Sequence, residues 1–197
     1  MKKAIYILTS VFLTAILISW NWTPTQHPKV EKTDVIECLN METKQAYQLE
    51  ASTPAFAALH PSPIKVLPEN LLGTMMTFEA ADGKQASAYY IAAKKKTNKY
   101  LIVIQEWWGL NDNVKMESDK YYTDLGDVNV IAVDMYDGKV AATPDSAMKL
   151  MRGADMGRMT AIIQGAIKYA GSKASIYSVG WCFGGMWSLQ TAILAGP

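Results

Sequence analysis

Residues 179–185, with the sequence VGWCFGG, constrain this chain more than any other segment. An apolar, β-favouring run precedes them (176–179), and a helix-like run follows (186–194). A strand therefore turns directly into a helix, with a cysteine at the apex and a glycine two positions to either side. Because a strand and a helix approach closely at such a turn, Gly180 and Gly184 have to lack side chains.

The apex residue, Cys182, is expected to be a nucleophile. The tight turn forces its backbone into a strained conformation and holds the thiol at the carboxyl end of the sheet. The positive end of the helix that follows favours the thiolate. Three alternatives are a small buried hydrophobe, a disulfide with Cys38, and a redox role, for which no second cysteine lies nearby. A core cysteine would not need flanking glycines and a strand-to-helix turn, which favours the nucleophile.

The pattern from residue 72 onward predicts an α/β fold. A leading hairpin turns at Asp82-Gly83. Three further strands, two of them continuously apolar, then alternate with helices, which implies a mostly parallel sheet flanked by helices. Active sites in such sheets lie at the carboxyl ends of the strands, where Glu106 and Asp134 follow two of them. The expected strands cover 75–79, 86–92, 101–104, 130–133 and 176–179; the expected helices cover 114–125 (capped by Asn113, ended by Gly126), 144–151 and 155–170 (ended by Gly171).

The N-terminal segment resembles a targeting signal. Lys2 and Lys3 precede an uncharged apolar stretch, residues 4–20, which predicts a secretory signal peptide or an N-terminal membrane anchor. Both place the remainder outside the cytoplasm, in the periplasm or the medium, with any membrane attachment through residues 4–20 only. Residues 21–71 are rich in proline and predict a linker, with short helices conceivable at 44–49 and 54–60.

Composition excludes some classes of partner. The net charge is +1 and half of the residues are apolar, so no nucleic-acid surface is expected. The basic run Lys94-Lys95-Lys96, followed by Lys99, predicts a solvated loop between two strands. We expect neither a metal site nor an organic cofactor.

Three segments together resemble the dienelactone hydrolase family: 105–111 (QEWWGLN), 134–136 (DMY) and 180–185 (GWCFGG). The resemblance runs from about residue 75 to the C-terminus. That family has the α/β-hydrolase fold, a cysteine nucleophile and no cofactor. The resemblance implies that Cys182 attacks the carbonyl of a small ester or lactone and that Glu106 contacts and helps to activate the thiol. It also implies that the backbone N–H groups of Phe183 and Trp107 form the oxyanion hole, with Gly180, Gly184 and Gly185 as the glycines of the turn.

Several of these residues have a structural alternative. Glu106 at a strand end would also fit a helix cap or a surface ion pair. Trp107 and Trp108 are expected to form pocket wall and core rather than take part in chemistry. Asp134 is expected to anchor its loop.

The sequence departs from the family in its histidines. The family completes its triad with an aspartate and a histidine after the nucleophile, whereas this chain has only His27 and His60. We therefore expect residues 72–197 to be the N-terminal part of a domain that lacks its C-terminal strands and helices, on the order of 80–100 residues. The strand before Cys182 would then be a sheet edge, and the 197 residues alone would be inactive or nearly so.

Substrate and class stay open at this point. The family's well-studied members place an arginine against the substrate carboxylate, but residues 142–148 hold none. An ester, a thioester or a different lactone is as good a candidate as the acidic lactone of the family. Two other classes are an amidotransferase with the same cysteine turn, and an exported binding protein on a degenerate hydrolase fold.

Overall fold

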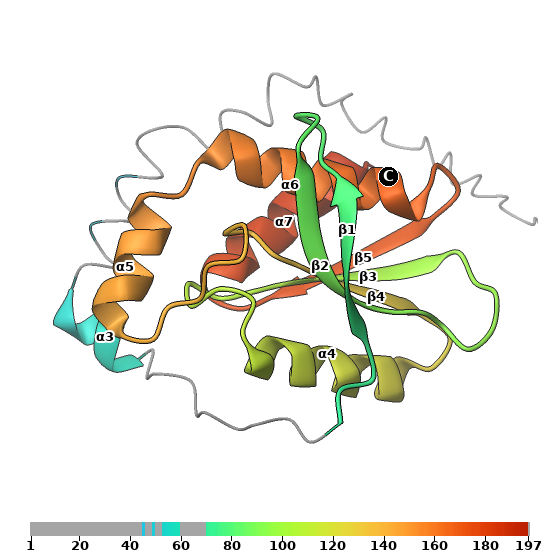
Figure 1. Ribbon diagram of the computed structural model, residues 1–197, viewed down its shortest axis with the longest axis horizontal. Helices are drawn as coiled ribbons and strands as arrows, with labels where there is room; N and C mark the ends of the chain where they lie inside the picture. Colours follow the sequence, from blue (N-terminus) through green and yellow to red (C-terminus); the bar gives the residue numbers. More distant parts are fainter. Residues whose placement is uncertain (1–44, 46–48, 50–52, 60–69, 197) are drawn as a thin grey trace, which may run out of the picture.

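The computed structural model describes residues 45, 49, 53–59 and 70–196 (Figure 1). The expected signal peptide or anchor, nearly all of the linker, the helix at 44–49 apart from two positions, Cys38, His27 and His60 lie outside the described residues. Within the described residues, no helix has the length and apolar character that a membrane crossing requires. The elements are α3 (Pro54–Leu59), β1 (Thr74–Glu79), β2 (Gln85–Ile91), β3 (Lys99–Ile104), α4 (Asp112–Leu125), β4 (Asn129–Val133), α5 (Pro144–Arg152), α6 (Met156–Ala170), β5 (Ser175–Gly180) and α7 (Phe183–Ala195).

The five strands form one mixed sheet in the order β1-β2-β4-β3-β5. Strands β3, β4 and β5 are parallel, whereas β2 is antiparallel to both β1 and β4. Four of the five strands therefore run in one direction, as the α/β pattern predicted. The predicted hairpin is confirmed, and Gly83 takes the positive φ of 77° that its turn requires.

Helices cover both faces of the sheet. Figure 1 shows α4 on one face and α6 and α7 on the other. Side chains of β3 alternate between the two sides: Ile102 and Ile104 belong to the core under α6 and α7, whereas Leu101 and Val103 belong to the core under α4. All of β4 is likewise buried on both faces. This double burial explains the continuous apolar runs of the sequence.

The helix ends follow local capping chemistry, with one correction to the expected starts. Helix α4 is capped by Asn111 rather than Asn113, because the Asn111 side chain accepts a hydrogen bond from the Val114 N–H at 3.1 Å. Asn113 instead lies in the first turn. Helix α7 begins at Phe183, directly after Cys182, as expected for a turn that leads straight from the strand into a helix. Gly126 and Gly171 follow the ends of α4 and α6 as expected.

Strand β5 is an edge of the sheet in the described part of the chain. Its alternate residues are exposed, including Tyr177, whose exposed fraction is 53%. The basic segment between β2 and β3 is exposed at Lys94, Lys95 and Lys96, which confirms the predicted solvated loop. Both features match what the sequence led us to expect.

Candidate active site

The carboxyl ends of β4, β3 and β5 lie side by side. In the ladder, Ile104 at the end of β3 pairs with Val133 of β4 and with Gly180 of β5. The segments that leave these strands therefore start from one edge of the sheet. They carry Glu106, Asp134 and Cys182, so the sheet brings the three sequence-predicted positions to the same edge.

Cys182 has a strained backbone. Its φ is 52° and its ψ is −115°, and it is one of two non-glycine residues with positive φ in the described part of the chain. Such a conformation costs on the order of 1–3 kcal/mol and persists only where the surroundings enforce it. Here α7 starts at the next residue, and the Gly184 N–H donates to the Trp181 carbonyl at 2.8 Å. The strand, turn and helix together hold the thiol side chain, which is half-buried.

The flanking glycines explain why this turn closes. A Cβ on Gly180 would overlap the carbonyl of Gly184, and a Cβ on Gly184 would overlap the carbonyls of Ile104 and Gln105. The two glycines thus permit α7 to pack directly on the ends of β5 and β3. Gly185 differs, because a Cβ there would meet only the Gly180 carbonyl at 3.5 Å, an ordinary contact.

The two residues beside Cys182 point to opposite sides of the sheet. Trp181 packs in the core under α4, where its ring stacks on Tyr121 with centroids 6.1 Å apart. Phe183 is buried in the core under α6 and α7, where its ring meets that of Tyr136 at 5.5 Å. Each side has a pocket of its own: Trp181 lines one, and Tyr136, whose ring contacts Phe183, lines the other.

The first pocket contains Glu106. It has a volume of about 360 Å³, and its wall includes Trp181 and Tyr121. Glu106 is half-buried there, at the start of the first turn after β3, where its carbonyl accepts a hydrogen bond from the Gly109 N–H at 3.3 Å. The carboxylate and the residue before the cysteine therefore face one cavity. The remaining lining residues are Asn111, Asn113, Val114 and Glu117.

Trp107 and Trp108 fill the core behind this turn. Their exposed fractions are 0% and 1%, and their rings pack edge to face with centroids 5.2 Å apart. The expected packing role of both side chains is confirmed. Phe183 is the first residue of α7, where backbone N–H groups have no partner four residues earlier in the helix.

Asp134 anchors its loop. Its carboxylate accepts hydrogen bonds from the Tyr136 N–H at 3.0 Å, the Gly138 N–H at 2.6 Å and the Ser87 hydroxyl at 3.2 Å. Only 3% of the residue is exposed. Its acceptor capacity is thus used within the protein, as expected for a structural carboxylate.

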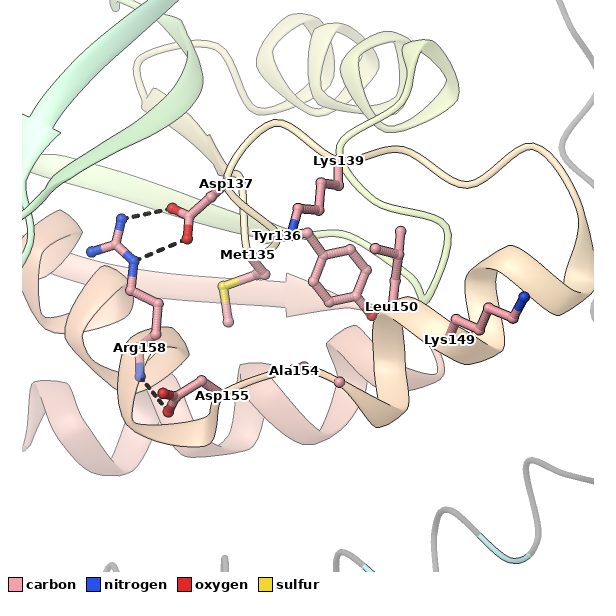
Figure 2. Close-up of a pocket in the computed structure, with 10 residues that line it drawn as sticks. Met135, Tyr136, Asp137, Lys139, Lys149, Leu150, Ala154, Asp155 and Arg158 are labelled. Atoms are coloured by element: carbon pink, nitrogen blue, oxygen red, sulfur yellow. Dashed lines mark hydrogen bonds and ion pairs between the residues drawn. The ribbon is translucent and has the colours of Figure 1, made fainter.

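The sequence reasoning assigned no role to Tyr136. This residue follows β4 in the Asp134 loop and lines the second pocket, of about 270 Å³ (Figure 2). Its exposed fraction is 6%, and its hydroxyl makes no hydrogen bond within the described part of the chain. Burial raises the pKa of Tyr136 well above its usual range, and the charge of Cys182 raises this pKa further. The segment 134–136 was the available signal, since it places a tyrosine two residues beyond a strand-end aspartate.

A mixed sheet covered on both faces, with a strained strand-to-helix turn at its carboxyl edge, is the architecture of the α/β-hydrolase fold. The model of the dienelactone hydrolase family matches residues 87–196, which is more than half of the chain. The chain belongs to this family.

Two curated relatives and a solved structure illustrate the similarity. "Protein usf" of Aquifex pyrophilus is 34% identical over 132 residues, which cover 61% of this chain and 55% of that protein. "Putative carboxymethylenebutenolidase" of Aquifex aeolicus (strain VF5) is 40% identical over 83 residues, covering 41% and 34% respectively. The solved structure named m3DLH is 20% identical with a TM-score of 0.49, covering 61% of this chain and 53% of its own. The chain thus spans about half the length, or less, of the curated relatives it matches.

Proposed function

We propose that this protein is a hydrolase that cleaves a small ester or lactone through a covalent intermediate on Cys182. The observation that carries the proposal is the strained Cys182 backbone at the start of α7, on the sheet edge that also carries Glu106. A chain accepts such strain where the geometry serves a function. Membership of the dienelactone hydrolase family supports the hydrolase class.

The proposed reaction has two steps. The Cys182 thiolate adds to the substrate carbonyl carbon, and the carbonyl electron pair moves onto oxygen. The backbone N–H groups of Phe183 and Trp107 stabilise this oxyanion. When it collapses, the carbon–oxygen bond to the alcohol breaks, the alkoxide takes a proton, and a thioester remains. Water then hydrolyses the thioester and restores the thiol.

Glu106 is proposed to act beside the thiol. The Glu106 side chain lines the same pocket as Trp181, the residue directly before the cysteine. A carboxylate in that pocket can accept the thiol proton or orient the group that does. The helix that follows Glu106, α4, is capped by Asn111.

The imidazole base is proposed to come from outside these 197 residues. The only histidines are His27 and His60, both before the described domain. We propose that an aspartate and a histidine beyond residue 197 complete the triad, and that residues 1–197 alone turn over slowly, because general-base assistance contributes typically 10²–10⁴-fold.

The substrate class is an uncharged or weakly acidic ester, thioester or lactone. Segment 142–148, which forms the cap and first turn of α5, presents Thr143, Pro144 and Ser146 in a capping box rather than an arginine. The hydroxyls of this segment bond one another and the local backbone, so they stabilise the helix start. Residues 142–148 therefore supply no guanidinium for a substrate carboxylate; the first arginine of α5 is Arg152, at its C-terminal end.

Export remains part of the proposal. Lys2, Lys3 and the apolar stretch 4–20 support a signal peptide or anchor that places the domain outside the cytoplasm. Fractionation of cells that express the full gene, followed by N-terminal sequencing of the mature protein, tests this. Recovery of the protein in the cytoplasm with its N-terminus intact would refute it.

The experiment for the proposed function is acyl trapping. The protein is incubated with p-nitrophenyl acetate, and the peptide that contains Cys182 is examined by mass spectrometry for an added acetyl group. We expect an acetyl group on Cys182 of the wild type that neutral hydroxylamine removes, as it does a thioester, and no acetyl group at this position in C182A. A full-length C182A variant that hydrolyses the ester as fast as the wild type would refute the cysteine mechanism. An unreactive wild-type thiol would instead favour a binding protein.

A further inference from the structure

We propose that Tyr136 positions and activates Cys182, through a hydrogen bond from its phenolic hydroxyl to the thiolate. This inference rests on the proposed function, since it assigns a further residue to the same thiol. Tyr136 comes from the loop after β4, and Cys182 from the turn after β5, with β3 between the two strands. Both loops leave the same edge of the sheet, where the ends of β4, β3 and β5 are paired side by side.

The first argument is the state of the Tyr136 hydroxyl. Only 6% of the residue is exposed, and the hydroxyl has no hydrogen-bond partner in the part of the chain that the structure describes, Cys182 included. The proposed bond is therefore one that forms when Cys182 ionises, not one already made in this structure. A buried hydroxyl without a partner destabilises a protein, because its hydration is lost and not replaced. A phenylalanine would fill the same space without that cost. The oxygen atom is therefore retained for an interaction beyond the core packing of the ring.

The second argument is where the ring lies. Its centroid is 5.5 Å from that of Phe183, the residue directly after the nucleophile. Figure 2 shows the hydroxyl end of Tyr136 beside Leu150 and turned away from Lys139, within the pocket that these residues line. The Asp134 carboxylate fixes the loop by accepting from the Tyr136 N–H at 3.0 Å. The hydrogen bond of the Tyr136 N–H to Asp134 and the contact of its ring with Phe183 thus fix the position of the phenol.

The third argument is the protonation state. Burial and the nearby thiolate both raise the pKa of Tyr136, so the phenol stays protonated at neutral and moderately basic pH. A neutral phenol is a donor that cannot compete with the thiol as an acid. Its hydrogen bond favours the charged form of the cysteine over the neutral form. The N-terminus of α7 favours the same form.

Other charged and titratable groups lie at the same edge of the sheet and around the two pockets, and the experiment holds them constant. They are Glu106 after β3, Asp134 after β4, Glu117 and Tyr121 on α4, and Lys139, Lys149, Asp155 and Arg158 around the pocket that Tyr136 lines.

The test is the pH profile of Cys182 alkylation in full-length protein. Wild type, Y136F and the control Y177F are treated with iodoacetamide between pH 5 and 10, and the peptide containing Cys182 is quantified by mass spectrometry. Tyr177 is an exposed tyrosine on β5, the strand that leads to Cys182. Y177F therefore makes the same chemical change away from the turn. The readout is the pH at which the rate is half of its plateau.

We expect Y136F to raise this midpoint by about one pH unit, which makes alkylation several-fold slower at pH 6. Y177F should match the wild type, and the thermal midpoint of Y136F should not fall. Incorporation of 3-fluorotyrosine at position 136, a stronger donor, should move the midpoint in the opposite direction, which keeps the test informative if Y136F folds poorly.

Two other outcomes are decisive. Superimposed profiles for wild type and Y136F, both with a midpoint below the ordinary cysteine value of about 8.5, would overturn the role of Tyr136 while the thiol remains activated. A midpoint at or above 8.5 in every variant would overturn both this inference and the proposed nucleophile. The two failures are therefore distinguishable.

Discussion

Replacing Gly184 by alanine should destabilise the protein strongly. The added Cβ would overlap the backbone carbonyls of Ile104 and Gln105, which belong to a fully buried strand end and cannot rotate away. Inserting an extra carbon into a packed core typically costs about 1–3 kcal/mol, and a backbone-to-backbone clash lies at the upper end of that range. For a domain of this size we expect G184A to lower the thermal midpoint by roughly 6–12 °C.

The next residue provides the control. A Cβ on Gly185 would meet the Gly180 carbonyl at 3.5 Å, which is ordinary van der Waals contact. Gly185 lies within α7, where alanine is favoured over glycine by about 0.5–1 kcal/mol. G185A should therefore leave the thermal midpoint unchanged or raise it slightly. The two variants make the same chemical change one position apart, and only G184A should lower the thermal midpoint.

Thermal unfolding followed by circular dichroism, with urea titration as a second measure, tests the pair. The rate of Cys182 alkylation in the folded proteins gives a separate view of the turn. Equal shifts for G184A and G185A would refute the steric account of the turn, because only the Cβ atom at position 184 would overlap backbone atoms.

Three further predictions concern other parts of the fold. D134A should lower the free energy of unfolding by about 2–4 kcal/mol, because three donors lose their charged acceptor; a urea titration that gives less than 1 kcal/mol would contradict the anchoring role. R158M should cost on the order of 1–2 kcal/mol, since its mostly buried guanidinium pairs with Asp137 and with the hairpin turn; a double-mutant cycle with D137N should show coupling, and additive effects would dismiss it. Burial raises the pKa of Tyr90 to about 12. Its contribution to stability is therefore complete below pH 10 and is lost as the pH rises through 12, so Y90F should flatten the stability profile above pH 10, and an unchanged slope would count against this.

The elements of this fold were predictable where the information is local. Continuous apolar runs marked β3 and β4, the Asp82-Gly83 turn marked the hairpin, and Gly126 and Gly171 marked helix ends. Each of these depends on residues within a few positions of one another. The glycine spacing around Cys182 belongs to the same group, because the clash it avoids is between a strand and the helix that follows it.

Non-local features were not predictable in the same way. Nothing in the sequence places β2 beside β4 rather than β3, because that pairing depends on how the whole sheet assembles. The choice of Asn111 over Asn113 as helix cap depends on how the turn after β3 leaves the sheet, and both residues are asparagine. Gly109 has a φ of 96° and would, with a Cβ, overlap the carbonyl of Lys139 from the next loop.

In the candidate site, too, the residues with a local sequence signal were predictable and the others were not. Cys182 and Glu106 could be proposed from strand ends and the spacing of the turn. The interest of Tyr136 became apparent only in three dimensions, because its buried hydroxyl and its contact with Phe183 arise from two segments more than forty residues apart. In the sequence, a tyrosine after a strand cannot be distinguished from an ordinary core residue, because the surroundings of its hydroxyl depend on the fold.

The residues on either side of Cys182 belong to different cores, and this has a consequence for divergence within the family. Trp181 packs against α4, whereas Phe183 packs against the loop that Asp134 anchors. Substitutions that reshape one cavity therefore leave the other layer intact to hold the strained cysteine. Substitutions around Trp181 and substitutions around Phe183 can therefore accumulate in separate steps of evolution. At each step, the packing on one side of the sheet still holds the turn.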